Sequence, residues 1–240
     1  MSKNVLVLGA NSDVAKQVIL LYVAKGYKVI AASRSTSGLD EFIAASAIPA
    51  DQIEVKYFDA ADFDSHPSFY QSLVQKPHIV IYAAGFLKTN EEAMAEWQDS
   101  FQMMTVNYSG AVSILNIIVS DAANTHLEKI VGLSSLSGVR GRKSNFIYGS
   151  TKSAFTQYLA GLRQHLAARK ITVNVLISGY IRTKINKGLD LPESMLLEPE
   201  YVAKCIVNSG SGFTIVPGFK WKIIYNILRV LPEALVAKLP

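Results

Sequence analysis

The sequence contains very little cysteine, and this limits the chemistry open to the chain. One cysteine, Cys205, occurs among 240 residues, which excludes an internal disulfide and a metal site built from several thiolates. It lies in an apolar helical stretch with Val202 and Ile206, so we predict a buried thiol and not a nucleophile. The four histidines show no metal-ligand spacing. The sequence therefore predicts no metal site and a reducing, cytoplasmic environment.

Long hydrophobic segments are also scarce. The first apolar run, Val5 to Ala10, is shorter than the core of a secretory signal and contains a glycine. One uncharged stretch, Ser100 to Ser120, is long enough to cross a membrane, but it carries Gln102, Asn107 and Asn116. We therefore expect a buried helix there and not a membrane span.

Acidic residues are fewer than basic ones. The chain has 24 Lys and Arg against 19 Asp and Glu, and half of its residues are hydrophobic. This composition supports a large core and argues against disorder. The basic surplus suits an anionic ligand, such as a phosphorylated cofactor, a phosphorylated substrate or a lipid headgroup. No nucleic-acid-binding motif accompanies it, so we predict no nucleic-acid partner.

Short β-rich apolar runs alternate with helical periods along the chain. The predicted strands are 5–8, 29–32, 53–58, 79–82, 130–133, 173–177 and 213–216. The predicted helices are 14–24, 39–47, 67–74, 91–98, 103–124, 146–168 and 201–207. This alternation predicts one α/β domain, 1–240, with a seven-stranded parallel sheet and helices on both faces. We expect 178–200 to form a substrate loop and 217–240 an amphipathic extension.

A glycine turn follows the first predicted strand, in Gly9-Ala10-Asn11-Ser12-Asp13-Val14-Ala15, and leads into a helix. Such a turn places backbone N–H groups and a helix N-terminus where a pyrophosphate can bind. The alternative is an ordinary tight turn capped by Ser12 or Asp13.

The second predicted strand ends in Ala32-Ser33-Arg34-Ser35, without the acidic residue that usually binds the ribose hydroxyls of NAD. Arg34 and its neighbouring hydroxyls suit a 2′-phosphate, so NADP(H) is favoured over NAD(H) as the cofactor. The alternative is a solvated arginine at a strand end.

Tyr148 and Lys152 lie four residues apart, and Ser135 lies upstream of them. On a helix, positions i and i+4 share a face, so the phenol and the ammonium can point into one site. The lysine is expected to lower the pKa of the phenol, and the serine hydroxyl can hold a substrate oxygen beside it. The group could thus move a proton on or off a carbinol oxygen. By itself, however, a Tyr-x-x-x-Lys spacing also occurs by chance.

In their order and spacing, these segments resemble the short-chain dehydrogenase/reductase family over the whole chain. That resemblance implies a single Rossmann-fold domain and catalysis by Asn107, Ser135, Tyr148 and Lys152. The cofactor-binding residues that it implies are Gly9, Asn11, Ser12, Asp13, Val14, Arg34, Asp59, Ala60, Ala84, Gly85, Tyr148, Lys152, Gly179, Ile181 and Thr183.

By this resemblance, the protein is an NAD(P)H-dependent carbonyl reductase or alcohol dehydrogenase and forms a homodimer or homotetramer. Tyr148 would donate the proton, Lys152 would lower its pKa and hold the nicotinamide ribose, and Ser135 would bind the carbonyl oxygen. Asn107 would kink its helix and hold a water that relays protons. The chain departs from the family pattern at Asp13, Ala15, Ala83 and Ser178, where the family has Gly, Gly, Asn and Pro.

The last segment, 219–240, projects Lys222, Asn226 and Arg229 onto one narrow helical stripe, with apolar residues over the rest. Three interpretations stay open: the segment covers the active site, packs in a dimer, or makes a peripheral contact with the inner membrane surface.

Short segments, namely 58–60 with 64–67, 145–152 and 238–240, resemble enzymes that reduce a decaprenylphosphoryl-2-keto-erythro-pentose in cell-wall synthesis. This resemblance implies a lipid-linked keto-sugar substrate and a role in cell-envelope synthesis. A soluble reductase of a small ketone or sugar phosphate and a non-enzymatic NADPH-binding regulator are the alternatives. The intact catalytic residues argue against the regulator.

Overall fold

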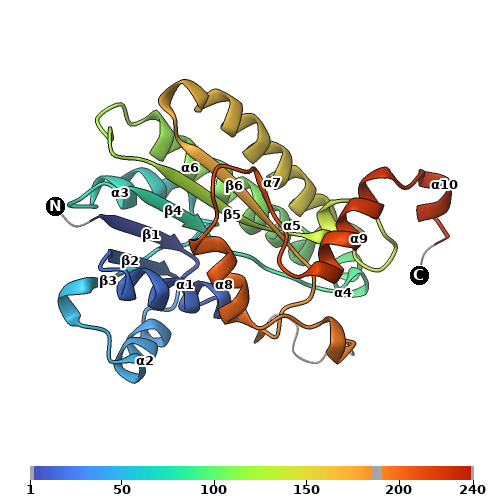
Figure 1. Ribbon diagram of the computed structural model, residues 1–240, viewed down its shortest axis with the longest axis horizontal. Helices are drawn as coiled ribbons and strands as arrows, with labels where there is room; N and C mark the ends of the chain where they lie inside the picture. Colours follow the sequence, from blue (N-terminus) through green and yellow to red (C-terminus); the bar gives the residue numbers. More distant parts are fainter. Residues whose placement is uncertain (1–2, 185–190, 239–240) are drawn as a thin grey trace.

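The computed structural model describes residues 3–184 and 191–238 and contains one parallel sheet of seven strands in the order β3-β2-β1-β4-β5-β6-β7 (Figure 1). The strands are β1 (Asn4–Leu8), β2 (Lys28–Ser33), β3 (Ile53–Tyr57), β4 (Ile79–Tyr82), β5 (Lys129–Ser135), β6 (Thr172–Ser178) and β7 (Thr214–Ile215). All seven predicted strands are therefore confirmed.

Helices cover both faces of the sheet. Successive side chains of a central strand point to opposite faces, and both sets are apolar, so each face needs a covering layer. In β1, Val5 and Val7 join a core with the helices α1 (Asp13–Ala24), α2 (Ser37–Ser46) and α8 (Pro199–Val207). Leu6 and Leu8 join the opposite core. The helices on that side include α3 (His66–Gln71), α6 (Gly110–Ser120), α7 (Phe146–His165) and α9 (Phe219–Val230).

The strand order reverses beside β1, which places a site at one edge of the sheet. From β1 the chain adds β2 and β3 on one side and then crosses over to pair β4 with the other side of β1. In open α/β sheets, ligands bind at the carboxyl ends of the strands where the order reverses. Gly9, Arg34 and Ala83 follow the strands that meet at this edge.

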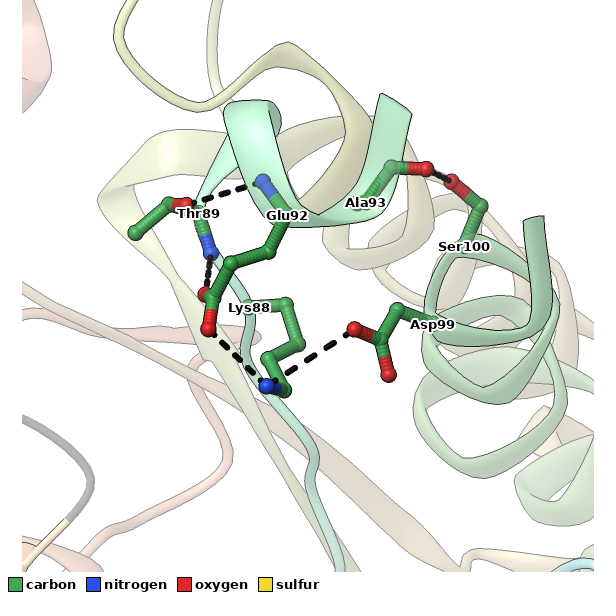
Figure 2. Close-up of polar contacts among 6 residues, drawn as sticks. All are labelled: Lys88, Thr89, Glu92, Ala93, Asp99 and Ser100. Atoms are coloured by element: carbon green, nitrogen blue, oxygen red, sulfur yellow. Dashed lines mark hydrogen bonds and ion pairs between the residues drawn. The ribbon is translucent and has the colours of Figure 1, made fainter. Parts of the chain in front are cut away.

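The predicted helix 91–98 is divided into two. α4 (Asn90–Ala95) begins at a capping box, in which Thr89 Oγ1 accepts from Glu92 N at 3.2 Å and the Glu92 carboxylate accepts from Thr89 N at 2.9 Å (Figure 2). The Lys88 ammonium lies between the carboxylates of Glu92 and Asp99, at 2.9 and 3.7 Å. Asp99 belongs to α5 (Trp97–Met104), so this pair of ion contacts joins the two short helices.

The apolar stretch Ser100 to Ser120 is part of a continuous helical segment, Trp97–Ser120, that is apolar and long enough to cross a membrane. It packs into the core instead, with Met103, Ile114 and Ile118 fully buried. The segment is not one regular helix, because a π-helical turn, Thr105–Ser109, joins α5 to α6.

The C-terminal extension forms α9 and a short helix, α10 (Glu233–Val236), which Leu231 and Pro232 separate. The apolar residues of α9 lie on two faces of the helix. Trp221 and Leu228 are buried against the domain. The other face of α9 is an exposed apolar stripe made of Phe219, Ile223, Ile227 and Val230, which are 45–78% exposed.

Candidate active site

One cavity of about 440 Å³ lies at the carboxyl edge of the sheet. Its walls come from the turn after β1, the ends of the following strands, the start of α7 and α9. Every residue predicted to bind the cofactor lines it, and so do Ser135, Tyr148 and Lys152. Asn107 is absent from this lining. The sequence therefore located one continuous site, although its residues are spread over most of the chain.

The turn after β1 fits a dinucleotide phosphate. Gly9 has a φ of +82°, and a Cβ there would lie 2.3 Å from the backbone N of Ala84, so a side chain is excluded by both strain and space. The side chain of Ser12 makes no capping bond with α1, and Ser12, Asp13 and Val14 line the cavity, so this helix begins at the cavity wall. A pyrophosphate can bind at such a helix N-terminus.

Asp13 has a structural partner that the sequence did not predict. Its carboxylate accepts from the backbone N–H of Lys184 at 2.8 Å. This bond ties the start of α1 to the segment after β6. The negative charge of Asp13, where the family has glycine, is therefore directed towards a loop amide.

The end of β2 fits a 2′-phosphate. Arg34 is exposed on the cavity wall and forms no ion pair with any residue that the structure describes. The Asn11 amide donates to Ser33 Oγ at 3.0 Å and to the Ser35 carbonyl at 2.6 Å, which fixes the two hydroxyl-bearing residues beside the arginine. Within the described ranges, Asp13 and Asp59 are the carboxylates that line the cavity, and neither follows β2.

A buried histidine that sequence reasoning did not single out holds the end of β3. His66 Nε2 donates to the carbonyl of Asp59 at 2.9 Å, and its Nδ1 accepts from Ser113 Oγ at 2.8 Å. The carbonyl can only accept, which fixes the proton on Nε2. The Asp59 carboxylate accepts from Ala61 N at 2.9 Å. The segment at Asp59 and Ala60, which is expected to bind the cofactor, is thus held by the His66 side chain. The spacing of single histidines in the sequence could not reveal this contact.

Ser135, Tyr148 and Lys152 converge because β5 ends at the serine and the first turns of α7 pack against that end. Lys152 is buried, and its ammonium donates to the carbonyl of Leu133 at 3.0 Å. The ammonium lies 5.7 Å from the centre of the Tyr148 ring. One face of α7 therefore carries both groups, as their i, i+4 spacing predicts.

The expected lowering of the Tyr148 pKa is wrong for this structure. Burial raises the pKa of the phenol to about 12, and the Ser135 hydroxyl offsets this only in part. Burial also lowers the pKa of Lys152 to about 8. Desolvation disfavours the charged form of each group and is the main cause of both shifts. At neutral pH the tyrosine is protonated, which is the form that a proton donor needs.

Asn107 lies in the middle of the π-helical turn and is fully buried. Its Oδ1 accepts from Phe86 N at 2.8 Å, and its Nδ2 donates to the Phe86 carbonyl and to Thr151 Oγ1, at 2.9 and 3.1 Å. A π-helical turn thus interrupts the regular helix at Asn107. The Asn107 side chain holds the segment at Phe86 against α7.

Gly179 lines the cavity and also lies against Trp221 of α9. A Cβ at this position would lie 2.1 Å from the Trp221 ring, so the glycine is required for α9 to pack on the cavity. Trp221 is held by a bond from its Nε1 to the Met195 carbonyl, at 3.0 Å, and by edge contact with Tyr180. Thr183 and Ile181 line the same wall.

The side of the cavity expected to receive the substrate contains residues that were not among the predicted site residues. They are Leu87, Leu136, Ser137, Arg142, Asn145, Tyr180 and Trp221. They lie in loops, in a 3₁₀ turn after β5 and in α9, outside any repeating pattern. The sequence signals were the expected substrate loop 178–200, the C-terminal extension, and the proximity of 142 and 145 to Tyr148.

A parallel sheet with this strand order and a glycine turn at its switch point is the fold of Rossmann-type dinucleotide-binding proteins. The family model described as short chain dehydrogenase matches residues 3–193. The chain therefore belongs to the short-chain dehydrogenase family and is an oxidoreductase of that family.

Individual relatives agree with this assignment. An uncharacterized oxidoreductase of Mycobacterium tuberculosis (strain H37Rv) is 23% identical over 241 residues, which cover 98% of this chain and 96% of that protein. The solved short-chain dehydrogenase of Burkholderia cenocepacia in complex with NADP has a TM-score of 0.82 at 17% identity, covering 98% of this chain and 95% of that one. ElxO with NADP bound has a TM-score of 0.80 at 22% identity, covering 92% and 99%.

Proposed function

We propose that the protein is an NADP(H)-dependent carbonyl reductase that converts a keto-sugar to the corresponding alcohol, with Tyr148 as the proton donor. The proposal depends on one observation: Ser135, Tyr148 and Lys152 line the same cavity as the glycine turn. A binding protein needs the turn alone, whereas the protonated phenol beside a serine hydroxyl is suited to proton transfer. The non-enzymatic regulator is therefore the weaker alternative.

Bound NADPH would supply a hydride to the carbonyl carbon. The chain's own part is to hold the carbonyl oxygen between the Ser135 hydroxyl and the Tyr148 phenol, so that the phenol proton moves to this oxygen as negative charge develops on it. With its pKa raised to about 12, the phenol is fully protonated before the reaction. The Lys152 ammonium near the ring stabilises the phenolate that is left behind.

Cofactor choice rests on Arg34 and the hydroxyls of its neighbours. An unpaired arginine at the end of β2, with no carboxylate beside it, favours a 2′-phosphate over a ribose diol. The bound NADP of the two solved neighbours supports a nicotinamide cofactor in the same kind of cavity. Asp59 and Ala60 would contact the adenine, while Ala84 and Gly85 would lie along the cofactor's nicotinamide half.

A lipid-linked substrate, and with it a role in cell-envelope synthesis, is supported by the position of α9. Trp221 on its inner face forms part of the cavity wall, while the exposed apolar stripe (Phe219, Ile223, Ile227, Val230) lies on its outer face. Lys220, Lys222 and Arg229 flank this stripe and are exposed. An apolar stripe between cations suits an anionic membrane surface, where the cavity could receive a polyprenyl-phosphate sugar. The loop 178–200 would cover the bound sugar, although 185–190 lie outside the described residues.

NADPH oxidation by the purified protein tests the proposed chemistry. The substrates are a small cyclic ketone, a free ketopentose, its 5-phosphate, and a short-chain prenyl-phosphate 2-ketopentose. We expect turnover of the sugar ketones, with the prenyl-linked sugar preferred. Preference for the small ketone would favour the soluble alternative. NADPH binding without oxidation of any carbonyl would support the regulator instead.

We also propose that the protein assembles as a homodimer or homotetramer. The outer faces of α4 and α5 expose Met94, Trp97 and Phe101, which are 46–70% exposed, and a second copy could cover them. Light scattering at micromolar concentration tests this expectation. A mass of one chain would contradict it and leave these side chains exposed in solution.

A further inference from the structure

The loop between Gly138 and α7 places two polar side chains on the substrate side of the cavity. Arg142 and Asn145 both line it, and Asn145 is the N-cap residue of α7, three positions before Tyr148. Asn145 does not cap the helix with its side chain. Its Nδ2 donates instead to Ser137 Oγ at 2.8 Å, which turns the amide towards the cavity wall that Ser135 and Tyr148 share.

This loop is held in place from both sides. The Asn90 amide at the start of α4 donates to the carbonyl of Lys143 at 2.7 Å. Arg140 donates to the carbonyls of Leu228 and Arg229 at the end of α9, at 2.9 and 3.2 Å. The capping box of Figure 2 fixes the start of α4 and thereby the position of Asn90. Arg142 and Asn145 are therefore presented by a braced segment.

Both side chains have polar atoms that are buried without a partner among the described residues. These atoms are Arg142 Nε and Asn145 Oδ1. The Arg142 guanidinium makes one long contact, at 3.5 Å, with Ser137 Oγ, and it forms no ion pair in the described part of the chain. Buried polar groups in proteins are normally satisfied, and an unpaired buried donor on a cation is especially unfavourable. Each side chain therefore keeps hydrogen-bonding capacity that the described residues do not use.

The charges of the cavity favour an anionic ligand at this position. The carboxylates among the described lining residues, Asp13 and Asp59, follow β1 and β3 on the cofactor side. Among the described residues, the substrate side thus has a guanidinium and no carboxylate. A guanidinium offers parallel N–H donors that match two oxygens of a phosphate, and the amide oxygen beside it can accept from a hydroxyl.

We propose that Arg142 and Asn145 form a substrate-recognition subsite, in which the arginine binds a phosphoryl group and the Asn145 carbonyl accepts from a neighbouring sugar hydroxyl. This inference rests on the proposed function, because it specifies the substrate class of the same cavity: a phosphorylated keto-sugar, either free or linked to a lipid. Specificity for the phosphorylated substrate would therefore come from this loop and not from the proton-transfer group at Tyr148.

Calorimetric titration of the NADP⁺-saturated protein with ribulose and with ribulose 5-phosphate tests the subsite without turnover, because both partners are already oxidised. NADP⁺ also occupies the phosphate sites at Gly9 and Arg34. We expect ribulose 5-phosphate to bind about 10- to 100-fold more tightly than ribulose. In Arg142→Gln this preference should fall to about threefold or less. Lys143→Gln removes the same charge from an exposed neighbour and should keep it. An unchanged preference in Arg142→Gln, with an unchanged melting temperature, would overturn the proposal.

Two further arms complete the test. In the first, farnesyl phosphate replaces ribulose 5-phosphate in the titration. Tighter binding of farnesyl phosphate indicates a lipid source of the phosphate, and weaker binding indicates a free sugar phosphate. NADPH oxidation measured in parallel separates the two proposals. A phosphate preference that depends on Arg142, without any oxidation of NADPH, would support the subsite and contradict the reductase. Reduction of ribulose by NADPH without a phosphate preference would support the reductase and contradict the subsite.

Discussion

The two ends of the cavity are built differently. At the cofactor end, Gly9, Arg34 and Asp59 each follow a strand of one parallel sheet, so that the register of the sheet places them side by side. At the substrate end, Arg142, Asn145 and Trp221 come from a loop and from α9, which are held by individual hydrogen bonds and ring contacts. The first end therefore depends on the geometry of the sheet, and the second depends on individual contacts.

Tyr148 lies where the two ends meet, and its replacement should give the largest effect. In Tyr148→Phe the proton donor is lost, and we expect NADPH-dependent reduction to fall by about 10³-fold or more while the Kd for NADPH stays nearly the same. Tyr158→Phe, on the same helix with its hydroxyl bonded to Asn116, is the matched control. Stopped-flow absorbance and fluorescence titration measure the two quantities. Full activity in Tyr148→Phe would remove the assignment of the donor.

Lys152 links the site to stability. Its pKa is about 8 in the folded chain and 10.5 ordinarily, so the unfolded chain binds more protons between these values. Stability attributable to this residue therefore rises with pH over that window. Between pH 8 and 10 we expect the free energy of unfolding to increase by about 2 kcal/mol more in the wild type than in Lys152→Met. Urea unfolding at the two pH values measures this difference, and parallel curves for both proteins would contradict it.

Arg34 tests the cofactor end alone. Arg34→Gln should lower the preference for NADPH over NADH, measured as the ratio of kcat/KM values, by about 10- to 100-fold, because a charge-assisted pair with the 2′-phosphate is lost. Lys28→Gln, at the opposite end of β2, removes the same charge and should leave the ratio unchanged. A ratio that is insensitive to Arg34 would place the 2′-phosphate elsewhere.

The outer face of α9 should give the smallest effect. The double variant Ile223→Asp, Ile227→Asp introduces charge into the exposed apolar stripe, and we expect binding to vesicles with anionic lipid to weaken several-fold. Val74→Asp, at a site that is 91% exposed away from α9, is the control. Co-sedimentation measures the bound fraction. Equal binding by all three proteins would favour packing of α9 against a second chain.

The sequence was sufficient wherever a residue's role depends on repeating backbone geometry. Strand alternation predicted the sheet, and the i, i+4 spacing predicted that Tyr148 and Lys152 share a face. It failed where desolvation decides: the pKa of Tyr148 is raised because burial outweighs the hydrogen bond from Ser135. It also did not reveal the packing of Trp221 that excludes a side chain at Gly179. Arg142 and Asn145 depend on bonds from α4 and α9, which spacing along the chain does not encode.

A crystal structure of the protein with NADPH would test the assignment of the two ends most sharply. We predict one extended cofactor, with its 2′-phosphate on Arg34, its pyrophosphate at the start of α1, and its nicotinamide ribose at Tyr148 and Lys152. The nicotinamide should leave the wall of Ser135, Arg142 and Asn145 open for substrate. A nicotinamide bound away from Tyr148, or a 2′-phosphate bound at Arg142 instead of Arg34, would contradict the division of the cavity into these two ends.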